Sequence, residues 1–240
     1  MSAPVITALS WEDLPGLFPN FSAPERWLPL LRAHARLIEA ASPRVRTSAV
    51  TPADAVRRHY AESLEILAVT GEPAGRWVDV GSGGGWPGMV AAILWSGVDV
   101  DLIEPLKKRA VLLGEMAETL GLRNVTVYPE RAEDAARGPL RESAAIVSAR
   151  AVAELRELLE YTVPFARRRG GLVVLPKGSS FAVEAEAAVT ATRLLGCRFQ
   201  RVVPMRVEVS EHVRIAVYER SGPLPRAYPR RPGTPGLHPL

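Results

Sequence analysis

Cysteine, histidine and lysine are scarce in this chain of 240 residues. The single cysteine, Cys197, excludes an internal disulfide, and the histidines at positions 34, 59, 212 and 238 lack the spacing of a metal-binding cluster. We therefore predict no metal site. Lysine occurs only at positions 107, 108 and 177, and the other 27 of the 30 basic residues are arginine. This arginine usage fits an RNA partner and a G+C-rich genome equally well.

Long apolar runs are also missing. Nowhere do eighteen apolar residues follow one another, so the sequence predicts no membrane-spanning helix. The first 21 residues contain Trp-Glu-Asp at 11–13 and lack the basic-then-apolar order of a signal peptide. We therefore expect a cytoplasmic protein. Its net charge of +4 and pI near 9.6 permit an RNA partner without requiring one.

A glycine-rich turn stands out against this background. Residues 76–88 read Arg-Trp-Val-Asp-Val-Gly-Ser-Gly-Gly-Gly-Trp-Pro-Gly, which predicts a buried strand, a tight turn and the start of a helix. Gly81 ends the strand, while Gly83 and Gly85 allow positive φ and leave room for a ligand to touch the main chain. Pro87 suits a first helical turn, where no amide donor is needed. The pattern indicates a nucleotide-cofactor loop.

Details of the loop discriminate between cofactors. Residues 83–88 satisfy G-x-G-x-x-G, but the motif begins too far along the chain, because the strand already ends at Gly81. Trp86 and Pro87 would also obstruct the path of a dinucleotide pyrophosphate. A Walker loop does not fit either, because Pro176 precedes Lys177 where glycine is needed. S-adenosylmethionine has no phosphates, and Glu104 ends the next strand about 20 residues downstream, where a ribose-binding acid belongs. The structural alternative is a turn that only permits tight packing of strand and helix.

Regular alternation of strands and helices follows the glycine turn. This pattern predicts an α/β fold of class I methyltransferase type, with a Rossmann-like, mostly parallel seven-stranded sheet that ends in an antiparallel hairpin. Residues 22–38 and a second helix from Thr51-Pro52 predict a helical cap over 1–70. The methyltransferase domain then spans 71–220. Predicted strands are 76–81, 98–104, 124–128, 144–149, 171–175, 199–209 and 212–218, and predicted helices of this domain are 87–95, 105–120, 151–166 and 180–195.

The last 20 residues differ in composition from the rest. Residues 221–240 are rich in proline and arginine and contain no acidic residue. We expect a flexible, basic tail outside the folded unit.

Several motifs together resemble those of one family. Asp-Val-Gly-Ser-Gly-Gly-Gly-Trp-Pro-Gly at 79–88, Pro-Leu-Lys-Lys-Arg at 105–109, Glu-Arg-Ala-Glu at 130–133, Val-Ser-Ala-Arg-Ala-Val-Ala at 147–153 and Pro-Lys-Gly at 176–178 closely resemble the GidB family, also called RsmG. The resemblance covers roughly residues 45–219. It implies an S-adenosyl-L-methionine-dependent enzyme that methylates N7 of a guanine in bacterial 16S ribosomal RNA of the small subunit. Arg58-His59 and Ser63 resemble the family's His-x-x-x-Ser helix, whereas Glu62 replaces its aspartate and residues 45–49 depart from its Asn-Leu-Thr.

The resemblance also implies roles for individual residues. Gly81 and Trp86 would contact the cofactor in the loop, Ala132 and Glu133 would hold its adenine side, and Arg150 would line the cofactor or the reaction centre. Together with the residues of the glycine motif, the predicted cofactor-binding set is Asp79, Gly81, Gly83, Gly85, Trp86, Glu104, Ala132, Glu133 and Arg150.

The chemistry of N7 methylation constrains the remaining roles. N7 of guanine is an unprotonated nucleophile, so the enzyme must hold and orient the base and needs no general base. Arg150 is the candidate catalytic residue, either donating to guanine O6 or binding the cofactor carboxylate. Lys177 is a candidate substrate contact or a structural ion pair. His59 is a candidate substrate residue or a packing residue.

Three functions remain open at this point. The first is the RNA guanine-N7 methyltransferase, acting on 16S ribosomal RNA or the small ribosomal subunit as a monomer. The second is a small-molecule methyltransferase, which would need a deep apolar pocket under the N-terminal cap. The third is a noncatalytic ribosome-assembly binder, which would be expected to carry damaged cofactor residues. The intact loop favours the first.

Overall fold

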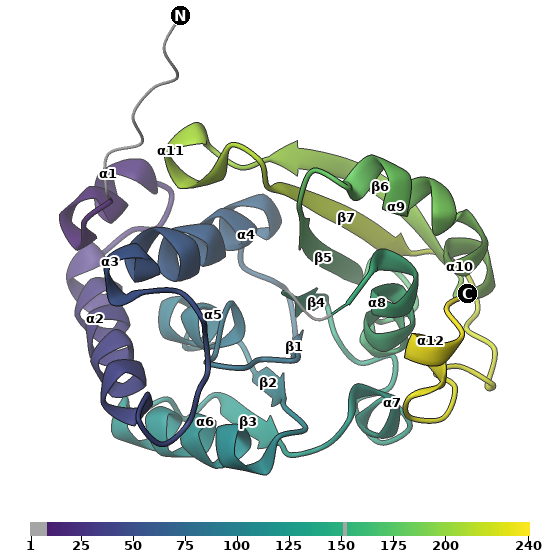
Figure 1. The fold of residues 1–240 in the computed structure, drawn as a ribbon, viewed down its shortest axis with the longest axis horizontal. Coiled ribbons are helices and arrows are strands. Elements are labelled where there is room, and N and C mark those ends of the chain that lie inside the picture. Colours follow the sequence, from purple (N-terminus) through teal and green to yellow (C-terminus); the bar gives the residue numbers. More distant parts are fainter. Residues whose placement is uncertain (1–8, 151–152) are drawn as a thin grey trace, which may run out of the picture.

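A seven-stranded sheet organises the chain, with strand order β3-β2-β1-β4-β5-β7-β6. The computed structural model describes residues 9–150 and 153–240. Its strands are β1 (Trp77–Val80), β2 (Val100–Ile103), β3 (Val125–Tyr128), β4 (Ile146–Ala149), β5 (Leu172–Lys177), β6 (Cys197–Pro204) and β7 (Arg214–Arg220). The first five strands are parallel, and β7 runs antiparallel to both β5 and β6. The predicted sheet, including its terminal hairpin, is confirmed (Figure 1).

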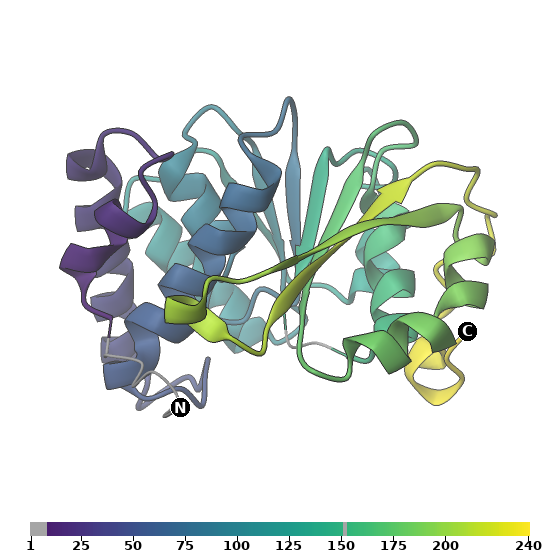
Figure 2. The same cartoon turned by 90° about the horizontal axis from the view of Figure 1, so that it is seen from above.

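Helices cover both faces of the sheet, as the view from above shows (Figure 2). Because β1, β2 and β4 are buried along their whole length, their side chains supply two separate cores. Trp77, Val100 and Ile146 pack on one face against the cap and helices α5 (Gly88–Leu94) and α6 (Lys107–Thr119). Val78, Ile103 and Val147 pack on the other against α7 (Ala132–Ala135), α8 (Leu155–Thr162), α9 (Phe181–Ala187) and α10 (Val189–Leu194).

The N-terminal cap is helical, as the sequence predicts. It consists of a 3-10 turn (Trp11–Asp13), α1 (Leu14–Leu17), α2 (Pro24–Ala41), α3 (Pro52–Ala55), a π-helical segment (Val56–Ala61) and α4 (Glu62–Thr70). The Thr51 hydroxyl accepts a hydrogen bond from the amide of Asp54 and so caps α3. Helix α2 packs against α5 and α6, which fixes the cap beside the glycine loop.

Some element boundaries differ from the sequence prediction. Helix α6 begins at Lys107, and Leu106, expected in its apolar stripe, is 53% exposed because it lies at the N-cap. Of the helix predicted over 151–166, residues 151 and 152 lie outside the described part, and α8 begins at Leu155. The hairpin strands are separated by a short helix, α11 (Val207–Ser210), so β6 ends five residues earlier than expected.

The C-terminal segment packs on the domain, contrary to the prediction of a flexible tail. The guanidinium of Arg230 makes hydrogen bonds of 2.6 to 3.0 Å to both carboxylate oxygens of Glu160, which is fully buried in α8. Arg137 and Arg141 donate to backbone carbonyls of the segment, and helix α12 (Thr234–Leu237) contacts α8. Composition failed here because Arg230 pairs with a buried acid and because Leu224, Tyr228 and Leu240 pack on the apolar core, and neither partner is visible in the composition of the segment.

Within the described ranges, no helix is both long enough and apolar enough to span a bilayer.

Candidate functional site

The glycine loop leaves β1 in a conformation that depends on Glu104. Gly81 has φ of 71°, in the left-handed region that favours glycine. The two carboxylate oxygens of Glu104 accept hydrogen bonds from the amides of Gly83 and Leu106, both at 2.9 Å. Glu104 therefore joins the loop after β1 to the start of α6, and its side chain is 3% exposed.

Asp79 binds the backbone at the end of the loop and is not among the residues that line the pocket above it. It is fully buried and accepts hydrogen bonds from the amide of Gly88 at 3.3 Å and the hydroxyl of Ser148 at 2.7 Å. Burial raises the pKa of Asp79 to about 6, although these bonds oppose the shift. Both carboxylate oxygens of Asp79 are therefore engaged with the chain itself, and its predicted contact with a cofactor stays a prediction.

Gly85 also turns away from the expected ligand side. A Cβ atom at Gly85 would lie 2.9 Å from Cβ of Met89 and 3.1 Å from Nε2 of His34. Glycine is required here because helices α2 and α5 approach the loop closely. His34 is fully buried, and its Nδ1 lies 2.8 Å from the hydroxyl of Tyr60.

A pocket of about 350 Å³ lies above the loop, at the carboxyl edge of the sheet. We call it the loop pocket. It contains exposed main chain, three cationic side chains and one carboxylate. Its lining residues are Thr47, Ser48, Ala49, Val50, Arg58, His59, Glu62, Gly81, Ser82, Gly83, Gly84, Trp86, Arg109 and Arg150.

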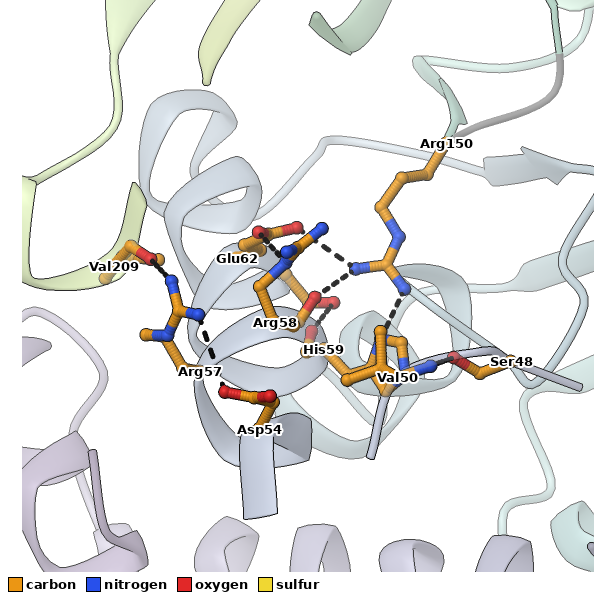
Figure 3. A network of polar contacts seen from close by, with 10 residues as sticks. Ser48, Val50, Asp54, Arg57, Arg58, His59, Glu62, Arg150 and Val209 are labelled. Atoms are coloured by element: carbon orange, nitrogen blue, oxygen red, sulfur yellow. Dashed lines mark hydrogen bonds and ion pairs between the residues drawn. The ribbon is translucent and has the colours of Figure 1, made fainter. Parts of the chain in front are cut away.

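Arg150 reaches from the end of β4 into the cap (Figure 3). Its Nη1 donates to the carbonyl of Arg58 at 2.8 Å and lies 3.4 Å from a carboxylate oxygen of Glu62. Its Nη2 lies 2.9 Å from Nδ1 of His59. One guanidinium therefore ties the sheet edge to three groups on the π-helical segment and α4.

Burial is the largest cause of the pKa shifts of His59 and Glu62, which both contact Arg150. The pKa of His59 falls to about 3, first because the ring is desolvated and second because Arg150 is close. Burial raises the pKa of the Glu62 carboxyl, against the opposing effect of the neighbouring arginines. His59 is therefore neutral at physiological pH.

His59 also joins the cap to the glycine loop. Its ring stacks on Trp86, with 3.8 Å between centroids and 15° between planes. Nε2 of His59 lies 2.8 Å from Oγ of Ser48. Trp86 is 5% exposed, and the Arg150 guanidinium carbon lies 5.7 Å from the Trp86 ring centroid.

The connection between α2 and α3 passes over the glycine loop (Figure 1). The carbonyl of Arg46 accepts a hydrogen bond from Nε of Arg109 at 3.0 Å. The carbonyl of Thr47 lies 3.8 Å from the position that a Cβ atom on Gly83 would take. Sequence reasoning missed the contribution of Thr47 and Ser48 because this segment departs from the family pattern. The sequence indicated this segment only by its position directly before Thr51, the N-cap residue of α3.

A second pocket of about 310 Å³ lies beside the first, under the cap. We call it the aromatic pocket because Trp11, Tyr60 and Trp86 line it, with Arg32 and Arg36. The residues that line both pockets are Thr47, Ser48, Val50, His59 and Trp86. Two cavities of similar size therefore share one wall.

Other predicted site residues lie elsewhere. Lys177 forms an ion pair with Glu184 at 2.5 Å and donates to the carbonyl of Ala153, so its ammonium is already engaged. Neither Ala132 nor Glu133 lines the loop pocket. The Glu133 carboxylate accepts a hydrogen bond from the amide of Gly233 at 3.0 Å.

Comparison with known proteins identifies relatives along most of the chain. The sequence is 37% identical over 218 residues to a ribosomal RNA small subunit methyltransferase G of Roseiflexus sp. (strain RS-1), covering 90% of this chain and 93% of the relative. It is 38% identical over 216 residues to the protein of that name from Symbiobacterium thermophilum, covering 86% and 87%.

Solved structures share the fold at lower identity. A MtNAS mutant in complex with S-adenosylmethionine has a TM-score of 0.52 at 19% identity, covering 88% of this chain and 77% of that one. A mutant 16S rRNA (adenine(1408)-N(1))-methyltransferase from Catenulisporales acidiphilia has a TM-score of 0.53 at 17% identity, covering 68% and 93%. The sequence model of GidB, described as rRNA small subunit methyltransferase G, matches residues 30–213. The chain therefore belongs to the GidB family.

Proposed function

We propose that this chain transfers the methyl group of S-adenosyl-L-methionine to N7 of a guanine in 16S ribosomal RNA of the small subunit. The observation that carries this proposal is the loop pocket, in which the glycine loop after β1 meets Arg150 after β4 in a chain of the GidB family. Open parallel sheets bind their ligands at this edge.

The residues of the loop pocket fit the cofactor. Its amino-acid end carries one ammonium and one carboxylate, and the pocket offers Glu62 for the first and Arg58, Arg109 or Arg150 for the second. Main chain at Gly81 and Gly83 gives close access. Glu104, which directly follows β2 and is not among the lining residues, is the proposed ribose contact. Ala132 and Glu133 complete the proposed set on the adenine side. When bound, the cofactor supplies a methyl group activated by its sulfonium.

The residues of this chain then have to orient a base and exclude water. N7 carries no proton, so none has to be removed, and a neutral His59 is compatible with this chemistry. Arg150 is the proposed catalytic residue because it enters the loop pocket from the sheet edge. Its contacts with Arg58, His59 and Glu62 hold it in place for a guanine or a cofactor carboxylate. For Lys177 we propose at most an indirect role in substrate binding, because Glu184 neutralises its charge.

The proposed partner is ribosomal RNA, bound by a monomer in the cytoplasm. Arg58 and Arg109 line the pocket, and exposed Lys107 and Lys108 lie next to Arg109 in sequence. Cations placed around a site attract the RNA backbone and make binding depend on salt.

One observation favours a second candidate, a small-molecule methyltransferase. The aromatic pocket under the cap is the feature that this alternative requires. Family membership weighs against it, and a pocket lined by flat aromatic rings also suits a single base flipped out of RNA.

Two measurements test the proposal. Calorimetry should detect binding of S-adenosylmethionine or its demethylated product and none of NAD, since Trp86 and Pro87 obstruct a pyrophosphate at this loop. After incubation with the protein and cofactor, 16S ribosomal RNA should break at one guanine upon reduction and aniline treatment, as N7-methylguanosine does. Methylation at an exocyclic amine, a ribose hydroxyl or a pyrimidine carbon would refute it.

A further inference from the structure

The hydrogen bonds of His59 define its tautomer. Nδ1 lies 2.9 Å from Nη2 of Arg150, and a guanidinium can only donate. Nδ1 must therefore accept and carries no hydrogen. A neutral imidazole then has its proton on Nε2, which lies 2.8 Å from Oγ of Ser48. His59 consequently donates to Ser48.

Because His59 donates to it, the Ser48 hydroxyl can only donate a hydrogen bond to a further partner. Its Oγ also accepts from the amide of Val50 at 2.9 Å. A hydroxyl has two acceptor lone pairs and one proton, so both lone pairs are in use. Within the described residues, the Ser48 hydroxyl proton has no acceptor among the hydrogen bonds of the structure. Arg150 and His59 thus convert Ser48 into an obligate donor.

Ser48 stands where the two pockets meet. Together with His59 and Trp86 it lines both the loop pocket and the aromatic pocket. Trp11, Tyr60 and Trp86 border the aromatic pocket, and the partly exposed ring of Trp11 is the one on which a nucleic-acid base can stack irrespective of its identity. Stacking therefore binds any base. Selectivity for one base requires a polar group that forms a hydrogen bond with the edge of that base.

We propose that the aromatic pocket receives the target guanine and that Ser48 donates to its O6. This inference rests on the proposed function. Guanine presents O6 and N7 side by side as acceptors on one edge, whereas adenine presents a donor amine in place of O6. An obligate donor at Ser48 therefore accepts guanine and rejects adenine. Because N7 is adjacent to O6, the same bond directs N7 toward the loop pocket.

The cofactor carboxylate is the competing acceptor for this proton. The loop pocket already holds Arg58, Arg109 and Arg150 for a carboxylate. Two hydroxyl residues, Thr47 and Ser48, line both pockets, and Ser48 is the one whose lone pairs are taken up by His59 and the amide of Val50. We therefore assign the Ser48 hydroxyl proton to the base. The experiment distinguishes this acceptor from the cofactor carboxylate.

The test combines a protein change with a base change. Once aniline cleavage has located the target guanine, that nucleotide is replaced by 2-aminopurine, which keeps N7 but lacks O6. For the unmodified protein, kcat/KM for methyl transfer from labelled S-adenosylmethionine should fall about tenfold on the altered RNA. Ser48→Ala should lose about tenfold on guanine and nothing further on 2-aminopurine. Independent losses that multiply to about a hundredfold would overturn the proposal.

Controls separate binding from folding. Ser48→Thr keeps the hydroxyl and should restore the discrimination. Cofactor affinity by calorimetry should be the same for Ser48→Ala and the unmodified protein, and a tenfold weaker affinity would assign the proton to the cofactor and overturn the inference. Ala55→Trp, at the partly exposed wall of the aromatic pocket, should abolish methylation while cofactor binding persists. Methylation by a folded Ala55→Trp at the original rate would exclude the pocket as the base site.

Failure of the proposed function gives a different result. If the unmodified protein methylates no guanine N7 at all, the function itself is refuted. If it does so but Ser48→Ala discriminates guanine from 2-aminopurine as well as before, only the role of Ser48 is refuted.

Discussion

His59 and Trp86 stack with 3.8 Å between ring centroids, and this contact joins the helical cap to the glycine loop. Trp86 belongs to the turn after β1, while His59 belongs to the π-helical segment of the cap. Arg150, from a third element, lies over the Trp86 ring and bonds His59. Three segments that are distant in sequence therefore meet at this contact.

Arg150→Lys tests how much of the site depends on a planar guanidinium. Lysine keeps the charge but cannot reach Arg58, His59 and Glu62 together. We expect kcat/KM to fall roughly tenfold to a hundredfold, because each charge-assisted hydrogen bond contributes about 1.5–3 kcal/mol. A raised cofactor Kd would mean that Arg150 holds the cofactor, and an unchanged Kd would mean that it acts on the base. Arg168→Lys, at an exposed position, is the matched control, and equal activity of the two variants would contradict the prediction.

Glu104→Ala removes the link between the glycine loop and α6. The amides of Gly83 and Leu106 lose their acceptor, and the proposed ribose contact disappears. We expect cofactor binding to weaken by at least about tenfold in calorimetry, since charge-assisted bonds contribute roughly 1.5–3 kcal/mol. Glu104→Gln retains an acceptor oxygen and should lose less. Wild-type affinity of Glu104→Ala would place the cofactor elsewhere.

Arg230→Ala tests whether the C-terminal segment stabilises the domain. The substitution leaves the carboxylate of Glu160 buried without its cationic partner. Breaking a buried ion pair in this way costs roughly 3–5 kcal/mol, which should appear in the free energy of unfolding by urea titration. Arg231→Ala, at the exposed neighbouring position, should change stability little. Unchanged stability of Arg230→Ala would show that the segment is detached in solution.

His34→Gln should reduce the acid sensitivity of folding. Burial lowers the pKa of His34 to about 4, against about 6.5 in an unfolded chain. As pH falls from 6.5 toward 4, the unfolded chain takes up a proton that the folded chain refuses, so stability falls with pH. His59 behaves in the same way down to about pH 3. Asp79 acts oppositely, since its folded pKa of about 6 lies above the unfolded value and favours the folded state as pH falls.

The measurement is the free energy of unfolding at several pH values between 4.5 and 6. Its slope against pH should be smaller in His34→Gln by about 1.4 kcal/mol per pH unit, the free energy of one proton per unit. His212→Gln, which changes an exposed histidine, is the matched control. An identical slope in His34→Gln and the unmodified protein would mean that His34 protonates in the folded state.

The sequence alone predicted those features that depend on local patterns. Apolar runs punctuated by glycine and proline identified the strands and the order of helices, because both periodicity and turn chemistry are local. Pro24 and Thr51 marked helix starts for the same reason. The family motifs identified the glycine loop and Arg150, and the spacing of the second strand identified Glu104; all three follow strands at one edge of the sheet.

Tertiary structure alone decided which of these residues line the loop pocket. Asp79 and Gly85 belong to the motif, but they support the loop, because burial and the close approach of α2 and α5 are not local properties. Composition misplaced the C-terminal segment, because the partner of Arg230 is a buried glutamate 70 residues away. The obligate donor state of Ser48 depends on His59 and Arg150, which only the folded chain brings together. Hydrogen-bond direction is a property of the assembled network, so no pattern in the sequence encodes it by itself.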